Sequence, residues 1–195
     1  EYAKREGYGL RLTGFDVARM GNDRCAAVCI QQIGALLWKV CHTEQWEKKL
    51  GDYTIGRIQS IASALNSTHN IVDEDGLGGP MLDVINANKK SEFAYKGFRN
   101  VGLSYKDNSY FGNPRTAAAF KLKELVEKGH ISLTDEVLCQ ELATLKFKYM
   151  TDGRRILVSK EDMRKEGIAS PNLADACLYA ISLINEVQQQ QDKQY

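Results

Sequence analysis

The sequence has 195 residues, of which 43% are hydrophobic and 26% charged, so we expect one globular domain over residues 1–195 that buries roughly two thirds of its unfolded surface. Lysine and arginine number 26 against 25 aspartates and glutamates, which excludes a strongly basic arm for binding a polyanion. Any contact with nucleic acid must come from a local patch. No apolar stretch approaches the ~20 residues of a membrane span, and no signal peptide opens the chain, so the sequence predicts a cytoplasmic protein with no membrane partner.

The sequence lacks the residue patterns of two common kinds of site, a zinc site and a P-loop. The five cysteines stand in scattered apolar runs, and none forms a pair with another cysteine or a histidine at zinc spacing, so we expect reduced packing thiols. No G-x-x-x-x-G-K-[ST] motif occurs, which excludes a P-loop ATPase in this part of the chain. Because the sequence begins at Glu1 rather than Met, we expect it to be an excised part of a longer protein.

The first half of the chain predicts strands followed by alternating helices and strands. Residues 8–43 contain three runs of apolar, β-branched and aromatic residues separated by short breaks, which is typical of an antiparallel meander. Isoleucines then recur at steps of three from Ile55 to Ile61, a spacing that predicts an amphipathic helix. The expected elements are strands at 8–18, 24–33 and 35–43, a helix at 52–66, a buried strand at 69–73, a helix at 79–89 and a strand at 91–98.

The second half is mainly helical. The segment 99–115 is rich in Gly, Asn, Ser and Tyr, which indicates a long loop with room for a hairpin. The last helix has Ser170 at its N-cap and Pro171 at its first position, and its glutamine-rich end at 188–195 is expected to fray. The other elements are helices at 115–129, 135–145 and 170–191, and strands at 146–150 and 154–160 joined by a turn at Asp152-Gly153. This order predicts an α/β fold with a mixed β-sheet, in which three antiparallel strands are followed by parallel ones and helices cover both faces.

Asp16 lies where a folded core does not favour a charge. It follows the apolar run L-T-G-F and precedes Val17. A buried carboxylate without a partner is costly unless a cation or a dense set of hydrogen bonds compensates it. Two interpretations are open: an ion pair with Arg11 or Arg19, or a ligand to a metal ion.

Asp73, Glu74 and Asp75 form an acidic run at the end of a predicted strand. In an extended chain Asp73 and Asp75 project to one side and Glu74 to the other. The run leads into a turn that allows close approach of another backbone or a phosphate, and its glycines are Gly76, Gly78 and Gly79. Taken alone, such a run is more typical of a solvated turn before a helix than of a site.

Asp175 lies in the first turns of the predicted last helix, where the helix dipole favours the ionised form. If the first strand is central and the fourth lies beside it, Asp16, Asp73 and Asp175 converge. Three converging carboxylates cannot all stay charged at neutral pH without cations, and oxygen ligands select Mg²⁺ or Mn²⁺. Two such ions about 4 Å apart stabilise the attacking and leaving oxygens in phosphodiester hydrolysis. The trio therefore predicts a metal-dependent nuclease that needs no nucleophilic side chain.

Four stretches that span most of the chain carry a family resemblance. They are GFDVARMGNDRCAAV (14–28), IVDEDGLGGPMLDVI (71–85), FGNPRTAAAFKLKELVEKGHISL (111–133) and RRILVSKEDMRKEGIASPNLADACLYAI (154–181). In sequence and in order they resemble the nuclease domain of the large terminase subunit of tailed bacteriophages, a branch of the RNase H-like fold. The resemblance implies that fold for this chain.

The resemblance also implies the roles of the acids. In the family the first acid precedes a G-x-D turn, the second ends a strand in a D-x-x-G-x-G pattern, and the third is the aspartate of A-D-A in the final helix. In this chain they are Asp16, Asp73 and Asp175, which would hold two Mg²⁺ or Mn²⁺ ions. The family often has Asp or His three residues before the last acid, whereas this chain has Asn172, which can ligate through its carbonyl but brings no charge. Asp75 is the alternative to Asp73 as second ligand.

Contacts to DNA are expected at phosphates, because headful cutting needs little reading of sequence. The candidates are basic residues near the acids or in the long loop: Arg19, Arg24, Arg99, Lys106, Arg115 and Lys160. Lys160 is the strongest candidate, because it lies in the family-like run just before the last acid.

For this chain the resemblance implies endonucleolytic cutting of concatemeric double-stranded viral DNA when packaging starts and when the head is full. It places the protein in the host cell cytoplasm and not in the mature virion. The implied partners are DNA, the ATPase domain of the same protein, the small terminase subunit and the portal protein. Two alternatives stay open: another RNase H-like nuclease, such as a Holliday junction resolvase or RNase H, and a portal-docking module with vestigial acids.

Overall fold

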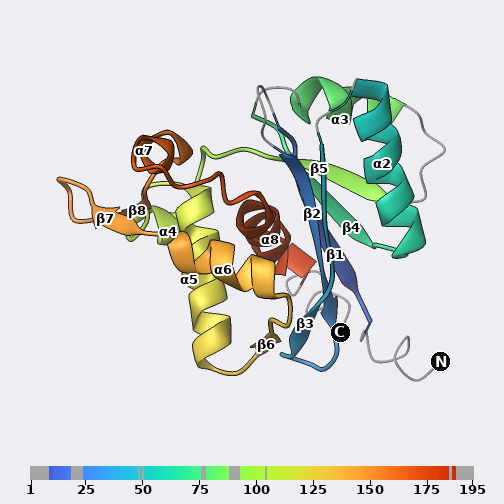
Figure 1. The fold of residues 1–195 in the computed structure, drawn as a ribbon. Helices are drawn as coiled ribbons and strands as arrows, with labels where there is room; N and C mark the ends of the chain where they lie inside the picture. Colours follow the sequence, from blue (N-terminus) through green and yellow to red (C-terminus); the bar gives the residue numbers. More distant parts are fainter. Residues whose placement is uncertain are drawn as a thin grey trace.

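The computed structural model describes residues 9–18, 24–47, 49, 51–75, 78–87, 93–103, 105–184 and 186–187, with the side chains of Tyr105 and Lys106 outside that description. Six strands form the central sheet: β1 (Arg11–Asp16), β2 (Arg24–Gln32), β3 (Trp38–Glu47), β4 (His69–Asp73), β5 (Ala94–Phe98) and β6 (Ile131–Ser132). Their spatial order is β5-β4-β1-β2-β3-β6 (Figure 1). β2 is antiparallel to β1 and β3, whereas β4 is parallel to β1, β5 to β4 and β6 to β3. The predicted mixed sheet, with the first strand central and the fourth beside it, is confirmed.

Helices cover both faces of this sheet, as predicted (Figure 1). α2 (Gly51–Ala64) and α3 (Gly78–Ala87) pack on one face, and α5 (Pro114–Glu127), α6 (Glu136–Thr144) and α8 (Asn172–Ser182) pack on the other. Because both faces are covered, β2 is buried continuously from Cys25 to Ile30 and shows no alternation of apolar and polar residues. Each face has its own apolar core.

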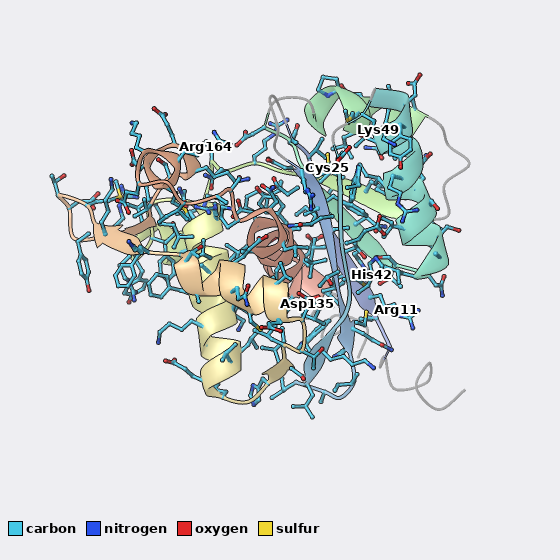
Figure 2. All side chains as sticks on the ribbon, in the orientation of Figure 1. Arg11, Cys25, His42, Lys49, Asp135 and Arg164 are labelled. Atoms are coloured by element: carbon cyan, nitrogen blue, oxygen red, sulfur yellow. The ribbon has the colours of Figure 1, made fainter. Side chains whose placement is uncertain are left out.

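Most of the cysteines are packed in these cores. All five are free, and Cys25, Cys29 and Cys177 are fully buried, which confirms the prediction of packing thiols. Cys25 begins the buried part of β2 (Figure 2). None of the helices in the described residues is long and apolar enough to cross a membrane.

Three short elements lie outside the prediction. They are β6, α4 (Tyr105–Asn108) and α7 (Lys160–Lys165). The predicted late hairpin is present as β7 (Phe147–Tyr149) and β8 (Arg155–Leu157), which form a separate two-stranded sheet. The second of these strands was expected to continue to residue 160, but the Ser159 side chain accepts a hydrogen bond from the Asp162 N–H and starts α7. Lys160 is therefore the first residue of a helix.

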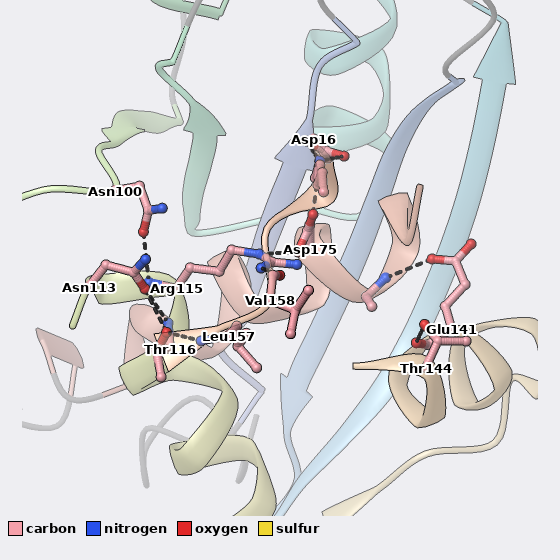
Figure 3. Close-up of polar contacts among 12 residues, drawn as sticks. Asp16, Asn100, Asn113, Arg115, Thr116, Glu141, Thr144, Leu157, Val158 and Asp175 are labelled. Carbon is pink, nitrogen blue, oxygen red and sulfur yellow. Dashed lines mark hydrogen bonds and ion pairs between the residues drawn. The ribbon is translucent and has the colours of Figure 1, made fainter. Parts of the chain in front are cut away.

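The start of α8 also differs from the prediction. Pro171, rather than Ser170, occupies the N-cap, and no side chain caps the helix from that position. Glu141 of α6 accepts a hydrogen bond from the Ala174 N–H instead (3.0 Å; Figure 3). The expectation of a local cap was wrong because the acceptor comes from a neighbouring helix. The expected fraying at 188–195 lies outside the described residues.

Candidate functional site

The three predicted acids come from distant parts of the chain and meet at one end of the sheet. Asp16 and Asp73 are the last residues of β1 and β4, and because these strands are adjacent and parallel, their ends lie at the same edge. Asp175 lies in the first turn of α8, which packs against β1. Asp16 is 3% exposed and Asp175 is fully buried. Both charges are therefore held inside the fold.

Two glycines allow this convergence. A Cβ on Gly14 would lie 2.0 Å from the carbonyl oxygen of Ala176 and 2.7 Å from the nitrogen of Ala180, so the backbone of α8 rests directly on β1. A Cβ on Gly78 would lie 1.6 Å from the carbonyl oxygen of Asp73, so α3 begins against the end of β4. A larger residue at either position would push a neighbouring element away from the acids.

Asp16 and Asp73 line a cavity of about 520 Å³. Its other polar walls come from the end of β4, the β5–α5 connection, the start of α5, α7 and α8: Asp75, Asn100, Asn113, Arg115, Ser159, Lys160, Glu161, Arg164, Asn172 and Tyr179. Asp175 lies behind this wall and reaches it through contacts with Lys160 and Arg115. The site is thus an open cavity with one acid placed deeper than the other two.

Lys160 joins two of the acids. Its Nζ donates to Oδ2 of Asp16 at 2.9 Å and to Oδ1 at 3.2 Å, and lies 2.8 Å from Oδ2 of Asp175. The lysine side chain is 28% exposed, whereas both carboxylates are almost or fully buried. The ammonium group therefore stands at the boundary between the buried acids and the open cavity.

Burial and the negative charges nearby raise the pKa values of Asp16 and Asp73. Burial raises the pKa of Asp16 to about 7; Lys160 opposes the shift, and the charges of Asp175 and Asp73 add to it. Burial likewise raises the pKa of Asp73 to about 6, although the Asp75 N–H and Lys160 both favour its charged form. Burial would lower the pKa of Lys160, but the charges of Asp16 and Asp175 outweigh it and hold that pKa above its usual value. The site has more negative charge than its cations offset.

The carboxylate oxygens of this site are of the chemical type that a hard divalent cation prefers. Three carboxylates, those of Asp16, Asp73 and Asp175, face two cations, Lys160 and Arg115. The two buried acids, Asp16 and Asp175, contact these cations, which leaves the charge of the half-buried Asp73 over. Carboxylate oxygens are the ligands that Mg²⁺ and Mn²⁺ prefer. Within the described part of the chain, no three Asp, Glu, His or Cys side chains stand ready to hold a metal ion. In this arrangement Lys160 supplies the positive charge between Asp16 and Asp175.

The other predicted ligands lie at the same cavity. Asp75 lines it, and its backbone N–H donates to Oδ1 of Asp73 at 3.1 Å. Asn172 is buried at the first position of α8 and also lines the cavity. Glu74 instead accepts a hydrogen bond from Nε of Arg99 at 2.7 Å. Of the acidic run, Asp73 and Asp75 therefore face the site, and Glu74 is paired elsewhere.

Of the predicted DNA-contact residues whose side chains the structure describes, two lie at the acids and two lie on the exposed surface. Lys160 and Arg115 lie at the acids, and Arg115 donates from Nε to Oδ1 of Asp175 at 2.7 Å (Figure 3). Arg24, at the start of β2, is exposed, and Arg99 is largely exposed but paired with Glu74. Arg19 and the side chain of Lys106 lie outside the described residues.

Several cavity residues were missed by sequence reasoning. Asn113 caps α5, and its side chain accepts from the Thr116 N–H, a role that the dipeptide Asn-Pro before a helical pattern could have indicated. Tyr179 lies four residues after Asp175, a spacing that predicts a shared helix face. Asn100 gave no signal, because its partner, the Arg115 N–H, is fixed only by the fold.

Comparison with solved structures shows which fold this is. The nuclease domain of the large terminase subunit gp2 of bacterial virus Sf6 is 19% identical over 93% of each chain, with a TM-score of 0.74. The nuclease domain of the large terminase g2p of bacteriophage SPP1, solved with bound Mn, is 14% identical over 92% of this chain and 89% of that one, with a TM-score of 0.54. The HK97 bacteriophage large terminase is 14% identical, with a TM-score of 0.64, over 89% of this chain and 39% of its own.

These matches show that the chain has the RNase H-like fold of terminase nuclease domains over about nine tenths of its length. No protein-family model and no curated protein sequence matches it.

Proposed function

We propose that this chain is the nuclease domain of a large terminase subunit, a metal-dependent endodeoxyribonuclease. It would cut concatemeric double-stranded viral DNA with little sequence preference, when genome packaging starts and when the head is full. The observation that carries the proposal is the convergence of three carboxylates, those of Asp16, Asp73 and Asp175, beside only two cations, Lys160 and Arg115. The shared fold supports it, and the Mn-bound SPP1 domain supports a divalent metal.

Asp16, Asp73 and Asp175 would hold Mg²⁺ or Mn²⁺, two ions in our proposal, with Asp75 and Asn172 as further ligands at the cavity wall. When bound, such ions supply an activated water and stabilise the leaving oxygen of a phosphodiester. Lys160 favours the ionised form of Asp16, which a cation requires of its ligands, and its Nζ also lies 2.8 Å from Oδ2 of Asp175. Its exposed side faces the cavity, so the ammonium group can also contact a phosphate.

The DNA backbone would be held by exposed cations around the cavity. Arg24 is exposed on the described surface, and Arg99 would have to exchange its partner Glu74 for a phosphate. Arg19 and Lys106 stay proposals from the sequence. Because the composition is nearly neutral, at 26 basic against 25 acidic residues, the isolated domain is expected to bind DNA weakly. An ATPase domain in the same protein, the small terminase subunit and the portal would raise the local DNA concentration in the host cytoplasm.

The test is plasmid cleavage by Asp16→Ala. Loss of this acid is expected to reduce Mn²⁺-dependent cutting of supercoiled plasmid by at least about 100-fold, because it removes a ligand from a carboxylate site. The matched control is Asp83→Ala, which removes an exposed aspartate on α3 and leaves the cavity untouched. Circular dichroism would show that both variants are folded.

Equal cleavage by the Asp16→Ala variant and the wild-type protein would contradict the catalytic assignment and favour a docking module. Substrate choice separates the enzyme alternatives. The wild-type protein is expected to cut linear and supercoiled duplex DNA alike. A strong preference for four-way junctions, or for the RNA strand of a hybrid, would instead identify another RNase H-like nuclease.

A further inference from the structure

Arg115 is built into the site by the start of α5. Asn113 caps this helix and Pro114 occupies its first position, so Arg115 falls at the second position, where the backbone N–H has no partner within the helix. The side chain of Asn100 accepts from that N–H at 3.1 Å. Asn100 thus holds the backbone of Arg115 directly, and Asn113 holds the start of the helix through the Thr116 N–H; both asparagines also line the cavity.

The guanidinium group links three separate segments. Nε donates to Oδ1 of Asp175 on α8 at 2.7 Å, and Nη1 donates to the carbonyl oxygen of Val158 at 3.3 Å (Figure 3). Val158 lies two residues before Lys160, between β8 and α7. The Arg115 side chain is 9% exposed and that of Asp175 is fully buried. One arginine therefore holds the deep acid and the segment that carries the lysine.

The two carboxylate oxygens of Asp175 therefore have different partners. Oδ1 is taken by Arg115, whereas Oδ2 lies 2.8 Å from Nζ of Lys160, on the side that faces Asp16. The guanidinium group donates to Asp175 and to the Val158 carbonyl oxygen from two different nitrogens, which a lysine, with a single nitrogen, cannot do in the same geometry. Asp175 can then offer only one oxygen to the shared centre of the site.

We propose that Arg115 is a positioning residue that orients the Asp175 carboxylate for divalent-ion binding and makes no contact with the DNA backbone. The inference rests on the proposed function. Burial separates Arg115 from the exposed Arg24 and Arg99: its side chain is 9% exposed, and its guanidinium group is already paired with Asp175. Partners that orient ligating carboxylates typically affect metal affinity as strongly as they affect turnover.

The first test is Mn²⁺ binding without DNA, measured by calorimetry on Arg115→Gln and Arg115→Lys. The glutamine variant is expected to bind Mn²⁺ about 10-fold more weakly, and the lysine variant to lie between it and the wild-type protein. The matched control is Arg155→Gln, which removes an arginine stacked on Phe120 of the same helix, 4.3 Å from the ring centre, and touches none of the acids. It is expected to keep the wild-type affinity.

The second test separates positioning from DNA contact. On plasmid DNA the glutamine variant is expected to lower kcat with little change in KM, whereas loss of a phosphate contact would raise KM. Millimolar guanidinium added to Arg115→Ala should restore Mn²⁺ affinity, and methylammonium should not.

The inference is overturned if Arg115→Gln binds Mn²⁺ within twofold of the wild-type protein, or if KM alone changes. Should the glutamine and alanine variants fail to fold, Arg115→Lys decides by the same twofold criterion. A wild-type protein that neither binds Mn²⁺ nor cuts DNA would overturn the proposed function and this inference together, whereas active wild-type protein with an indifferent Arg115 would overturn the inference alone.

Discussion

The buried carboxylate of Asp16 lowers the free energy of unfolding at the position where the proposed site needs a ligand. A sheet position flanked by apolar residues would be filled best by an apolar or neutral side chain, yet here it has a carboxylate that is 3% exposed. Lys160 offsets part of that cost, but the pKa of Asp16 still rises to about 7. The folded state therefore holds the proton of Asp16 more tightly than the unfolded chain does.

We expect Asp16→Asn to stabilise the metal-free protein, and more so at high pH. A folded-state pKa above the unfolded value of 3.8 gives wild-type Asp16 a stability contribution that is present below pH 4 and is lost as the pH rises to about 7. The advantage of the asparagine variant should therefore grow by about 2–3 kcal/mol between pH 5 and pH 8. Urea unfolding in EDTA at both pH values measures it, with Asp83→Asn as the exposed control. A difference that is constant with pH would contradict the expected charge cost.

The residues of the site also show what a sequence can and cannot reveal. Asp16, Asp73 and Asp175 were predicted to converge, because parallel strands present their carboxyl ends at one edge. Lys160 and Arg115 were expected at DNA, and the structure places both against acids. The sequence could not show this, since the burial of Arg115 depends on how α5 packs on α8.

At the scale of elements, the contact between α8 and β1 decides the geometry of the site. The helix is buried on all sides from Asn172 to Ile181, and its backbone rests on Gly14. The longer strands were predicted well because they are runs of apolar, β-branched and aromatic residues, and the first long helix because its isoleucines recur at helical spacing. The two-residue β6 and six-residue α7 are too short for any period, and the start of α8 depends on Glu141 of another helix.

Gly14→Ala should separate α8 from the sheet. The added methyl group would lie 2.0 Å from the Ala176 carbonyl oxygen, and that atom belongs to backbone that cannot rotate away. We expect a loss of about 2–4 kcal/mol in the free energy of unfolding. Gly56→Ala is the matched control, because its Cβ would meet nothing within 4 Å on α2 and helical alanine is favoured. Urea unfolding of both variants tests this, and equal stability of the two would contradict the close packing of α8 on β1.

The molecule as a whole should be stabilised by the ion that its acids are proposed to bind. An ion that binds only the folded state adds about 2.7 kcal/mol at a concentration of 100 Kd for each site. We therefore expect Mn²⁺ to raise the thermal midpoint above that in EDTA, and NaCl at equal ionic strength to leave it unchanged. The Asp16→Ala variant should lose most of the Mn²⁺ effect. A shift of equal size in that variant would show that the ion binds elsewhere.

The close packing of α8 on Gly14 also determines when the site can form during protein synthesis. β1 and β4 are synthesised before the other parts of the site, so Asp16 and Asp73 are already present while the chain is still being made. Asp175 and the helix backbone that covers Gly14 arrive only after Lys160 and the hairpin β7–β8. Until then that face of the sheet has α5 and α6 but lacks the helix that packs on β1, and the deep acid is missing. A nascent chain therefore cannot assemble the site before it has closed its own core, so a cutting activity would appear only in a molecule that has finished folding.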